Sequence, residues 1–287
     1  MGLFTKKNKA EQEPQYYLSA TNEPTYNYKV YYMKASEKLL TFILAFLVGA
    51  AVGYLFYGGI GKDEFGQPTT LTWVLNITIP AIVGAVAGRL FVPMRVESII
   101  AKRKKDLNHQ FRDMLESLTT SLGAGKNVND SFFGVYEDLK VQYEADAFIL
   151  KELEVIISGI HNNVPLEDVL EDFGVRSDNE DIQSFANVFK ISYRKGGNIK
   201  DIIRNTHSIL SDKMEITEDI ETLVSSNKLE QNIMIVMPIA LIGVIKMMSP
   251  EFAANFVTPT GIISTTVSIA IFVVAYFIGK AVLDIKI

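Results

Sequence analysis

Apolar residues gather in four long runs, two near the start of the chain and two near its end. An α-helix needs about 20 apolar residues to cross the hydrocarbon core of a bilayer, and each run approaches that length. A soluble helix is rarely apolar on every side for so long, because one face normally meets water. The pattern therefore predicts four transmembrane helices, at residues 39–57, 71–91, 233–248 and 262–283.

The third of these runs is the shortest, and it contains Pro238 and Lys246. Lys246 falls near the end of its predicted helix, where a long charged side chain reaches water by snorkelling. A lysine within a membrane helix is also a candidate functional charge. Both interpretations of Lys246 stay open at this point.

Glycine pairs occur at a spacing of four residues in the first two apolar runs. The first run holds Gly49 and Gly53, and the second holds Gly84 and Gly88. This spacing lets two membrane helices approach closely through their backbones. The pairs therefore either pack these two helices together or reflect only the high frequency of glycine in membrane helices.

Between the second and third runs, apolar residues recur at the period of an amphipathic helix and show no strand alternation. Leu107, Phe111 and Leu118 belong to one such stripe. The segment is predicted to be one six-helix domain built from helical hairpins, which makes the fold class all-α. Its last helix, from Ile199, has no interruption before the third membrane run, so we expect the two to be continuous.

Glycine and asparagine mark where the domain helices begin and end, as capping residues do. An asparagine followed by an apolar residue and an acidic helix start occurs three times, at Asn127, Asn163 and Asn198. We interpret this pattern as repeated capping chemistry at the positive ends of helix dipoles. The second domain helix is predicted to start near Asn129 or Asp130, and the third to cover 145–159. The fourth is predicted to run from Leu166 to Phe173 with Gly174 at the end, and the fifth to run from Asn179 to Gly196.

The positions of lysine and arginine predict the orientation of the chain in the membrane. The loop at 58–70 has only Lys62 and the loop at 249–261 has neither residue type, whereas basic residues flank the other helix ends. The chain should therefore lie in the cell membrane, with both termini and the middle domain on the cytoplasmic side. The predicted parts are a cytoplasmic segment 1–38, membrane helices in 39–91, the cytoplasmic domain 92–231, and membrane helices with a short cytoplasmic tail in 232–287.

The N-terminal segment is polar and lacks the short apolar core of a cleavable signal peptide. We expect it to be mobile or lightly ordered. Its tyrosines, Tyr26, Tyr28, Tyr31 and Tyr32, are placed to lie at the membrane surface, where aromatic side chains are enriched.

Composition excludes several kinds of chemistry. With no cysteine, the chain forms no disulfide and has no thiolate nucleophile, and its three histidines form no metal-spaced pair. A net charge of −5 argues against general nucleic-acid binding. The run from Gly58 to Lys62 is superficially similar to a phosphate loop, but it lacks the earlier glycine, and Asp63 replaces the required Ser or Thr. We therefore expect no catalytic, cofactor or metal site and no enzymatic activity.

Several local motifs stand out in the second part of the chain: Phe111–Leu115 leading to Leu122–Gly125, Asn163–Leu170, Gly196–Ile199, Met237-Pro238 and Ser249–Phe252. Together they resemble the type II secretion system F domain family over residues 107–283. The order of two membrane helices, one F domain and two more membrane helices is similar to the platform proteins of Tad (tight adherence) pili, the TadB/TadC group. The family often has glycine where Asn163 stands.

The resemblance implies a non-enzymatic platform in the cytoplasmic membrane that helps lift pilin subunits into a filament. The partners it implies are a cytoplasmic ATPase, pilin subunits, a paralogous F-domain protein, further copies of the chain and the lipid bilayer. One alternative is a permease subunit of a transporter, although Asn76, Arg89 and Lys246 supply few polar groups in the membrane segments. Another is a membrane-bound sensor, which the absence of nucleotide and phospho-acceptor motifs disfavours.

Basic residues near the predicted turns are candidates for partner contact, because the rest of the domain is rich in acid. The alternative is that they are ordinary surface charges. The candidates are Arg112, Lys126, Arg194, Lys195, Lys200 and Arg204.

Overall fold

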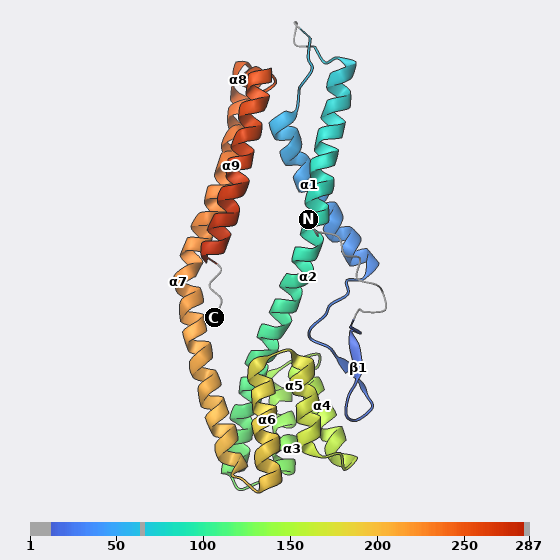
Figure 1. Cartoon of the computed structure of the whole chain (residues 1–287), viewed down its shortest axis with the longest axis vertical. Coiled ribbons are helices and arrows are strands. Elements are labelled where there is room, and N and C mark those ends of the chain that lie inside the picture. The colour runs from blue at the N-terminus through green and yellow to red at the C-terminus, as the bar shows by residue number, and fades with distance from the viewer. Residues whose placement is uncertain (1–12, 64–66, 284–287) are drawn as a thin grey trace. The chain divides into compact units, whose positions relative to one another are not determined.

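The computed structural model describes residues 13–63 and 67–283 (Figure 1). The chain divides into two units, each compact in itself. Unit 1 comprises the segment up to Tyr32 together with Val96–Glu215, and unit 2 comprises Met33–Arg95 and Ile216–Ile287. The elements are β1 Tyr16–Leu18, β2 Pro24–Tyr26, α1 Ala35–Tyr57, α2 Thr70–Gly123, α3 Val128–Gln142, α4 Phe148–His161, α5 Leu166–Ser177, α6 Glu180–Lys195, α7 Ile199–Met248, α8 Pro250–Phe256 and α9 Pro259–Leu283.

Four helices are long and apolar enough to cross a membrane, as the sequence predicted: α1, α2, α7 and α9. Inside unit 2 their apolar side chains are mostly exposed, with at most 17% of each apolar window buried. The all-α class is also confirmed, with one short antiparallel hairpin, β1–β2, as the strand structure of the described residues.

Two of these helices belong to both units. α7 runs unbroken from Ile199 to Met248, which confirms the predicted continuity. α2 does the same from Thr70 to Gly123, so the boundary placed at residue 92 falls inside a helix and not at a break. Chain continuity through residue 92 means that the second apolar run and the first domain helix are one element.

In unit 1, successive helices pack antiparallel. The register of α2 and α3 shows this directly, because Ser117 pairs with Asp138 and Asp113 pairs with Tyr143. The other neighbouring helices are joined by short turns, and the two helices on either side of each turn contact one another. These contacts are Tyr136–Glu154 for α3/α4, Gly159–Val169 for α4/α5, Glu167–Arg194 for α5/α6 and Asp181–Lys213 for α6/α7.

This up-and-down order places alternate turns at the same end of the unit. The turns at 124–127, 162–165 and 196–198 therefore share one end, which we call the turn end. The turns at 143–147 and 178–179 share the opposite end with the points where the chain enters at Val96 and leaves at Glu215.

The core of unit 1 is formed by the predicted apolar stripes. Leu107, Phe111 and Leu118 are fully buried, as the sequence predicted. Phe111 lies at the centre of the core, with its ring 5.4 Å from that of Phe185 and 6.1 Å from that of Phe173. Each fully buried side chain of this size adds about 1.5–3 kcal/mol to the driving force for folding.

The described part of the N-terminal segment is ordered against unit 1, so the prediction of a lightly ordered segment at the membrane surface is wrong for residues 13–32. Tyr28 is 2% exposed within the core. Tyr26 and Tyr28 both meet the ring of Phe148 edge-on. Tyr31 lies under the guanidinium of Arg103, 4.2 Å from its ring centroid. Residues 1–12 lie outside the described part of the chain.

Several predicted helix limits are also wrong. The third domain helix, predicted at 145–159, is α4 and covers Phe148–His161. The cap of α3 is Asn127, whose side chain accepts the N–H of Asp130, and not Asn129 or Asp130. α5 continues through Gly174 to Ser177. Gly174 serves close packing and does not end the helix, because a Cβ there would lie 3.1 Å from the Cα of Gln183 in α6.

The three Asn–apolar steps divide into two kinds. Asn127 and Asn198 cap the helices that follow them, each accepting the N–H of an aspartate three residues later. Asn163 instead adopts φ 56°, in the left-handed region, directly after α4. Asparagine tolerates this conformation better than other non-glycine residues, so Asn163 closes one helix and does not cap the next.

Candidate functional site

The turn end of unit 1 carries several exposed basic side chains. Lys126 lies in the first turn, while Lys195 and Lys200 stand on either side of the third. Gly196 ends α6 in the left-handed conformation, with φ 71°. Ile199, at the start of α7, is 9% exposed and fixes the third turn to the core.

Acidic residues at the start of α5 face basic residues at the end of α6. Arg194 pairs with Glu167 at 3.1 Å and with Asp168 at 3.2 Å. Lys190 bonds Glu171 at 2.5 Å, and this hydrogen bond is the main reason that the pKa of Lys190 is raised. Because Arg194 is 55% exposed, its ion pairs contribute little to stability, and its guanidinium stays accessible beside the turn end.

Two of the six predicted contact residues lie away from this cluster. Arg204 is further along α7 and pairs with Asp201 at 3.0 Å. Arg112 lies about 17 Å along α2 from its last residue, at 1.5 Å per residue. It pairs with Asp113, which also accepts the hydroxyl of Tyr143 at 2.5 Å. Burial first, and then this bond to Asp113, raises the pKa of Tyr143.

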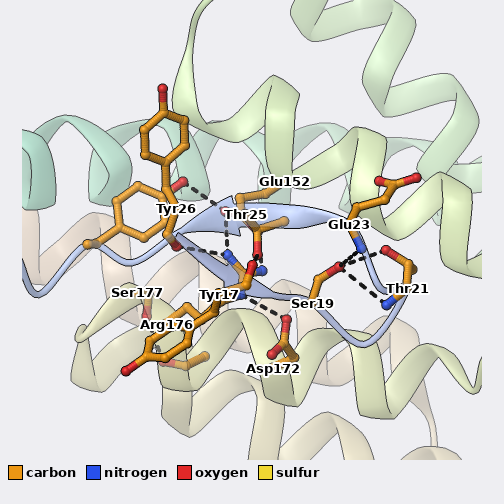
Figure 2. A network of polar contacts seen from close by, with 12 residues as sticks. Tyr17, Ser19, Thr21, Glu23, Thr25, Tyr26, Glu152, Asp172, Arg176 and Ser177 are labelled. Carbon is orange, nitrogen blue, oxygen red and sulfur yellow. Dashed lines mark hydrogen bonds and ion pairs between the residues drawn. The ribbon is translucent and has the colours of Figure 1, made fainter. Parts of the chain in front are cut away.

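A buried charged network joins the N-terminal segment to α4 and α5 (Figure 2). Arg176 donates to both carboxylate oxygens of Glu152, at 2.9 and 2.7 Å. Its third nitrogen bonds Asp172 at 2.8 Å, and it also donates to the carbonyl of Tyr26 at 3.1 Å. Tyr28 completes the network by donating its hydroxyl to Glu152 at 2.8 Å. The side chains of Arg176 and Glu152 are 2% and 3% exposed.

This network stabilises one charge state of each member. Burial lowers the pKa of Arg176, but the hydrogen bond to Glu152 and the two nearby carboxylates outweigh burial, so the pKa is raised overall. Burial, with the charge of Glu152, raises the pKa of Tyr28 well above its usual value. The result is a fixed attachment of residues 13–32, which precede α1, to the body of unit 1.

Sequence analysis missed this network, although one signal was present. Glu152 follows Ile149 by three residues and precedes Ile156 by four, so it lies on the apolar face of α4. A lone acid on such a face indicates a buried partner, because a buried charge is otherwise very costly. The identity of that partner, 24 residues away, is not visible in local periodicity.

The glycine pairs of unit 2 lie where α1 and α2 meet. A Cβ on Gly49 would come within 2.6 Å of the Cβ of Ala87, and a Cβ on Gly84 would come within 2.7 Å of the carbonyl oxygen of Phe46. Gly53 faces Pro80 at 3.2 Å in the same way, and Gly88 is covered by the ring of Phe42 at 2.7 Å. A Cβ would therefore clash with backbone at Gly84, overlap a side chain at Gly49 and Gly88, and make a tight contact at Gly53.

Lys246 contacts the end of α1. Its ammonium donates to the carbonyl of Leu55 at 2.7 Å and lies 4.5 Å from the ring centroid of Phe256. The last carbonyls of a helix carry partial negative charge, so the lysine stabilises the C-terminal end of α1. Further polar contacts in unit 2 join Tyr57 to Thr266 at 3.0 Å.

Among residues 13–63 and 67–283, no group of three or more His, Asp or Glu side chains is placed to hold a metal ion. Comparison of the chain with protein-family models, with curated proteins and with solved structures gives no match. The functional argument therefore starts from the geometry of the two units.

Proposed function

We propose that the chain is a platform protein of the cytoplasmic membrane in a Tad-type or type IV-like pilus, or in a type II secretion machine. In this proposal unit 1 is an F domain on the cytoplasmic side, with both termini. It receives movement from a cytoplasmic ATPase, and unit 2 passes that movement to pilin subunits during their extraction from the bilayer.

The observation that carries this proposal is the continuity of α7. The helix is anchored in the core of unit 1 by Ile203, Leu210 and Met214, all buried. It then continues without a break through a charged stretch at 215–230 and ends as an apolar run that finishes at Met248. Apart from the bond that Pro238 cannot donate, the backbone of α7 is that of one continuous helix, and a continuous helix transmits displacement better than a flexible linker does. α2 provides a second connection of the same kind.

Local geometry at the motif residues also supports the assignment to the F domain family. Asn163, where the family often has glycine, has the left-handed φ that glycine adopts readily. Gly196, in the Gly-Gly-Asn-Ile motif, has it as well. Ser249 of the Ser-Pro-Glu-Phe motif accepts the N–H of Phe252 and begins α8. Each of these motif residues has a structural reason to be of its type.

The turn end is the proposed surface for the ATPase. Lys126, Lys195 and Lys200 are exposed there, and Arg194 is beside them. These basic groups can pair with acidic groups of a partner, and such charge complementarity increases the rate of association. Arg112 and Arg204 are not part of this proposed surface, since they lie within α2 and α7 and not at the turns.

Charge reversal tests this surface in the native host. Lys195→Glu with Lys200→Glu should reduce co-purification of the secretion ATPase about 10-fold or more and reduce surface filaments, while the amount of protein in the membrane stays constant. Lys140→Glu is the matched control, because Lys140 is an exposed lysine near the opposite end of unit 1. Equal loss in the control, or unchanged ATPase binding in the double variant, would contradict the proposed surface.

Gene deletion tests the platform role itself. Deletion should abolish filaments or secretion of the machine's substrates and leave solute uptake unchanged. Normal filaments and secretion with a specific uptake defect would instead favour a permease subunit.

Alkaline phosphatase fusions test the topology: activity is expected for a fusion at Gly61 and not for one at Gly196.

A further inference from the structure

Unit 2 contains a cavity of about 650 Å³ at the end where α1 finishes. Its wall includes the turn at 58–63 and part of α8. A second cavity of about 430 Å³ adjoins it and is lined by Tyr54 and Trp73. Lys62 and Lys246 line both cavities. Two lysines from different elements therefore border the same space.

The glycine-rich turn brings the two lysines together. Gly59 and Gly61 have φ values of 93° and 82°, which allow the chain to fold back after α1. The N–H of Gly59 donates to the side chain of Asn76 at 2.8 Å, which fixes the turn against α2. The ammonium of Lys62 lies over this turn, 3.8 Å from the position of a Cβ on Gly59.

The charges in the cavity are not balanced by the described residues that line it. Lys246 uses N–H donors on the carbonyls of Leu55 and Phe56, at 2.7 and 3.4 Å, and an ammonium has three donors. Lys62 forms no ion pair with any residue in 13–63 or 67–283. Among the described residues that line the cavity, Asp63 is the acid, and its carboxylate accepts the N–H of Gln67 at 2.7 Å. Two cations against one engaged carboxylate leave room for an anion.

The surroundings indicate which anion. The cavity lies at the ends of α1 and α7 and the start of α2, all of them apolar helices of membrane length. Tyr54 and Trp73 stand beside it, and these residue types are enriched at the depth of lipid headgroups. At this depth an ammonium group pairs with the phosphate of a headgroup through charge-assisted hydrogen bonds.

We propose that this cavity binds the phosphate of an anionic phospholipid, with Lys62 and Lys246 as its donors and with the rest of the lipid against Tyr54 and Trp73. The proposal is independent of the pilus or secretion role. It also differs from a nucleotide site, because the amide of Gly59 is already bonded to Asn76 and the next helix begins only at Thr70. The side chains, and not the loop amides, hold the phosphate.

Trp73 supplies a direct probe, since it is the only tryptophan in the chain. The full chain is placed in phosphatidylcholine nanodiscs, and part of the lipid is replaced by dibrominated phosphatidylglycerol or by dibrominated phosphatidylcholine. Quenching of Trp73 should reach half its maximum at a several-fold lower mole fraction of the brominated phosphatidylglycerol. Each lysine should account for roughly a fivefold preference, so Lys62→Met and Lys246→Met should each reduce it by that factor.

Lys38→Met is the matched control, because Lys38 lies in the first turn of α1, at the other end of that helix. It should leave the preference unchanged. Lys62→Met keeps the test valid if Lys246→Met weakens folding, because Lys62 is exposed and Lys246 bonds the end of α1. Equal quenching by the two lipids, or equal loss in Lys38→Met and Lys62→Met, would overturn the proposal. Loss of the preference for phosphatidylglycerol in inorganic phosphate, but not in sodium chloride of equal ionic strength, would also overturn the proposal. The cavity would then bind a soluble anion.

Discussion

Unit 1 and unit 2 hold their helices together by different means. Unit 1 has a closed hydrophobic core in which Phe111, Phe132 and Phe185 are almost fully buried, and it buries the Glu152–Arg176 ion pair. In unit 2 at most 17% of any apolar window is buried, and the large apolar side chains face outward. Its helices meet instead at glycines and through polar side chains that bond backbone carbonyls.

The difference follows from the solvent that each unit is built for. Water drives apolar side chains together, so a water-exposed unit is stabilised by burying them. Lipid gives no such drive, and helix association there depends on close backbone approach and hydrogen bonds. α7 shows both regimes in one helix, because Leu210 is 2% exposed whereas Met247 is 88% exposed.

The largest expected effect comes from breaking the charged network of unit 1. Arg176→Met leaves the Glu152 carboxylate buried without its cation, which costs about 3–5 kcal/mol. The melting temperature of the full chain in detergent should fall by about 10 °C. Hydrogen exchange should increase in peptides of α4, α5 and residues 13–32 and stay unchanged in α1.

The controls for this variant separate buried from exposed charge. Arg112→Met removes an ion pair whose arginine is 32% exposed, so it should cost about 1 kcal/mol or less. Replacing both charges, Glu152→Met with Arg176→Met, should recover part of the loss because no charge is then left unpaired. Similar melting temperatures for Arg176→Met and Arg112→Met would show that the buried network is unimportant.

The next largest effect should come from filling the α1–α2 contact of unit 2. Gly84→Ala places a Cβ 2.7 Å from the carbonyl of Phe46, and backbone cannot move aside as a flexible side chain does. We expect a loss of about 2–3 kcal/mol, seen as faster hydrogen exchange in α1 with unit 1 unaffected. Gly243→Ala is the matched control, since its Cβ would make an ordinary contact of 3.7 Å with Leu55. If both alanine variants melt alike, close glycine packing does not stabilise unit 2.

Alkaline pH should remove the stabilisation that Tyr28 gives to unit 1. Tyr28→Phe removes a hydrogen bond to a buried carboxylate and should cost about 1.5–2 kcal/mol at neutral pH. Because burial raises the pKa of Tyr28 above its usual value near 10, the unfolded chain loses this proton first. The stabilisation is therefore complete below about pH 10 and is lost as the pH rises further.

The measurement is the difference in melting temperature between wild type and Tyr28→Phe from pH 7 to pH 11. The difference should be constant up to about pH 9 and should narrow above pH 10. Tyr32→Phe serves as the control, because Tyr32 is 43% exposed and bonds only the carbonyl of Glu13. A difference that stays constant through pH 11 would contradict the proposed linkage.

Local sequence patterns predicted the parts of the fold that depend on one element at a time. The four apolar runs, the buried stripe from Leu107 to Leu118 and the caps Asn179 and Gly196 are of this kind. Each is specified by residues within a few helical turns of one another, so periodicity and capping chemistry are sufficient.

Features that join distant elements were not predictable in the same way. The Tyr28–Glu152 bond joins residues that are 124 positions apart, and nothing in residues 13–32 indicates a partner in α4. The proposed contact surface was only partly predictable for a related reason. Membership of the turn end depends on helix order and exact helix limits, which place Lys126 there and Arg112 in mid-helix.

The smallest expected effects distinguish the two kinds of Asn turn in unit 1. Asn163 has φ 56°, so Asn163→Ala should cost about 1 kcal/mol, whereas Asn163→Gly should be neutral or slightly stabilising. Asn127 acts instead through its side chain, which accepts the N–H of Asp130 at 2.8 Å, so Asn127→Ala should also cost about 1 kcal/mol. The decisive comparison is between Asn163→Ser and Asn127→Ser, measured as melting temperatures. Serine caps a helix well but is a poor left-handed residue, so only the Asn163 variant should melt lower. Equal melting temperatures for the two serine variants would show that Asn163 also acts as a cap and that the turns are equivalent.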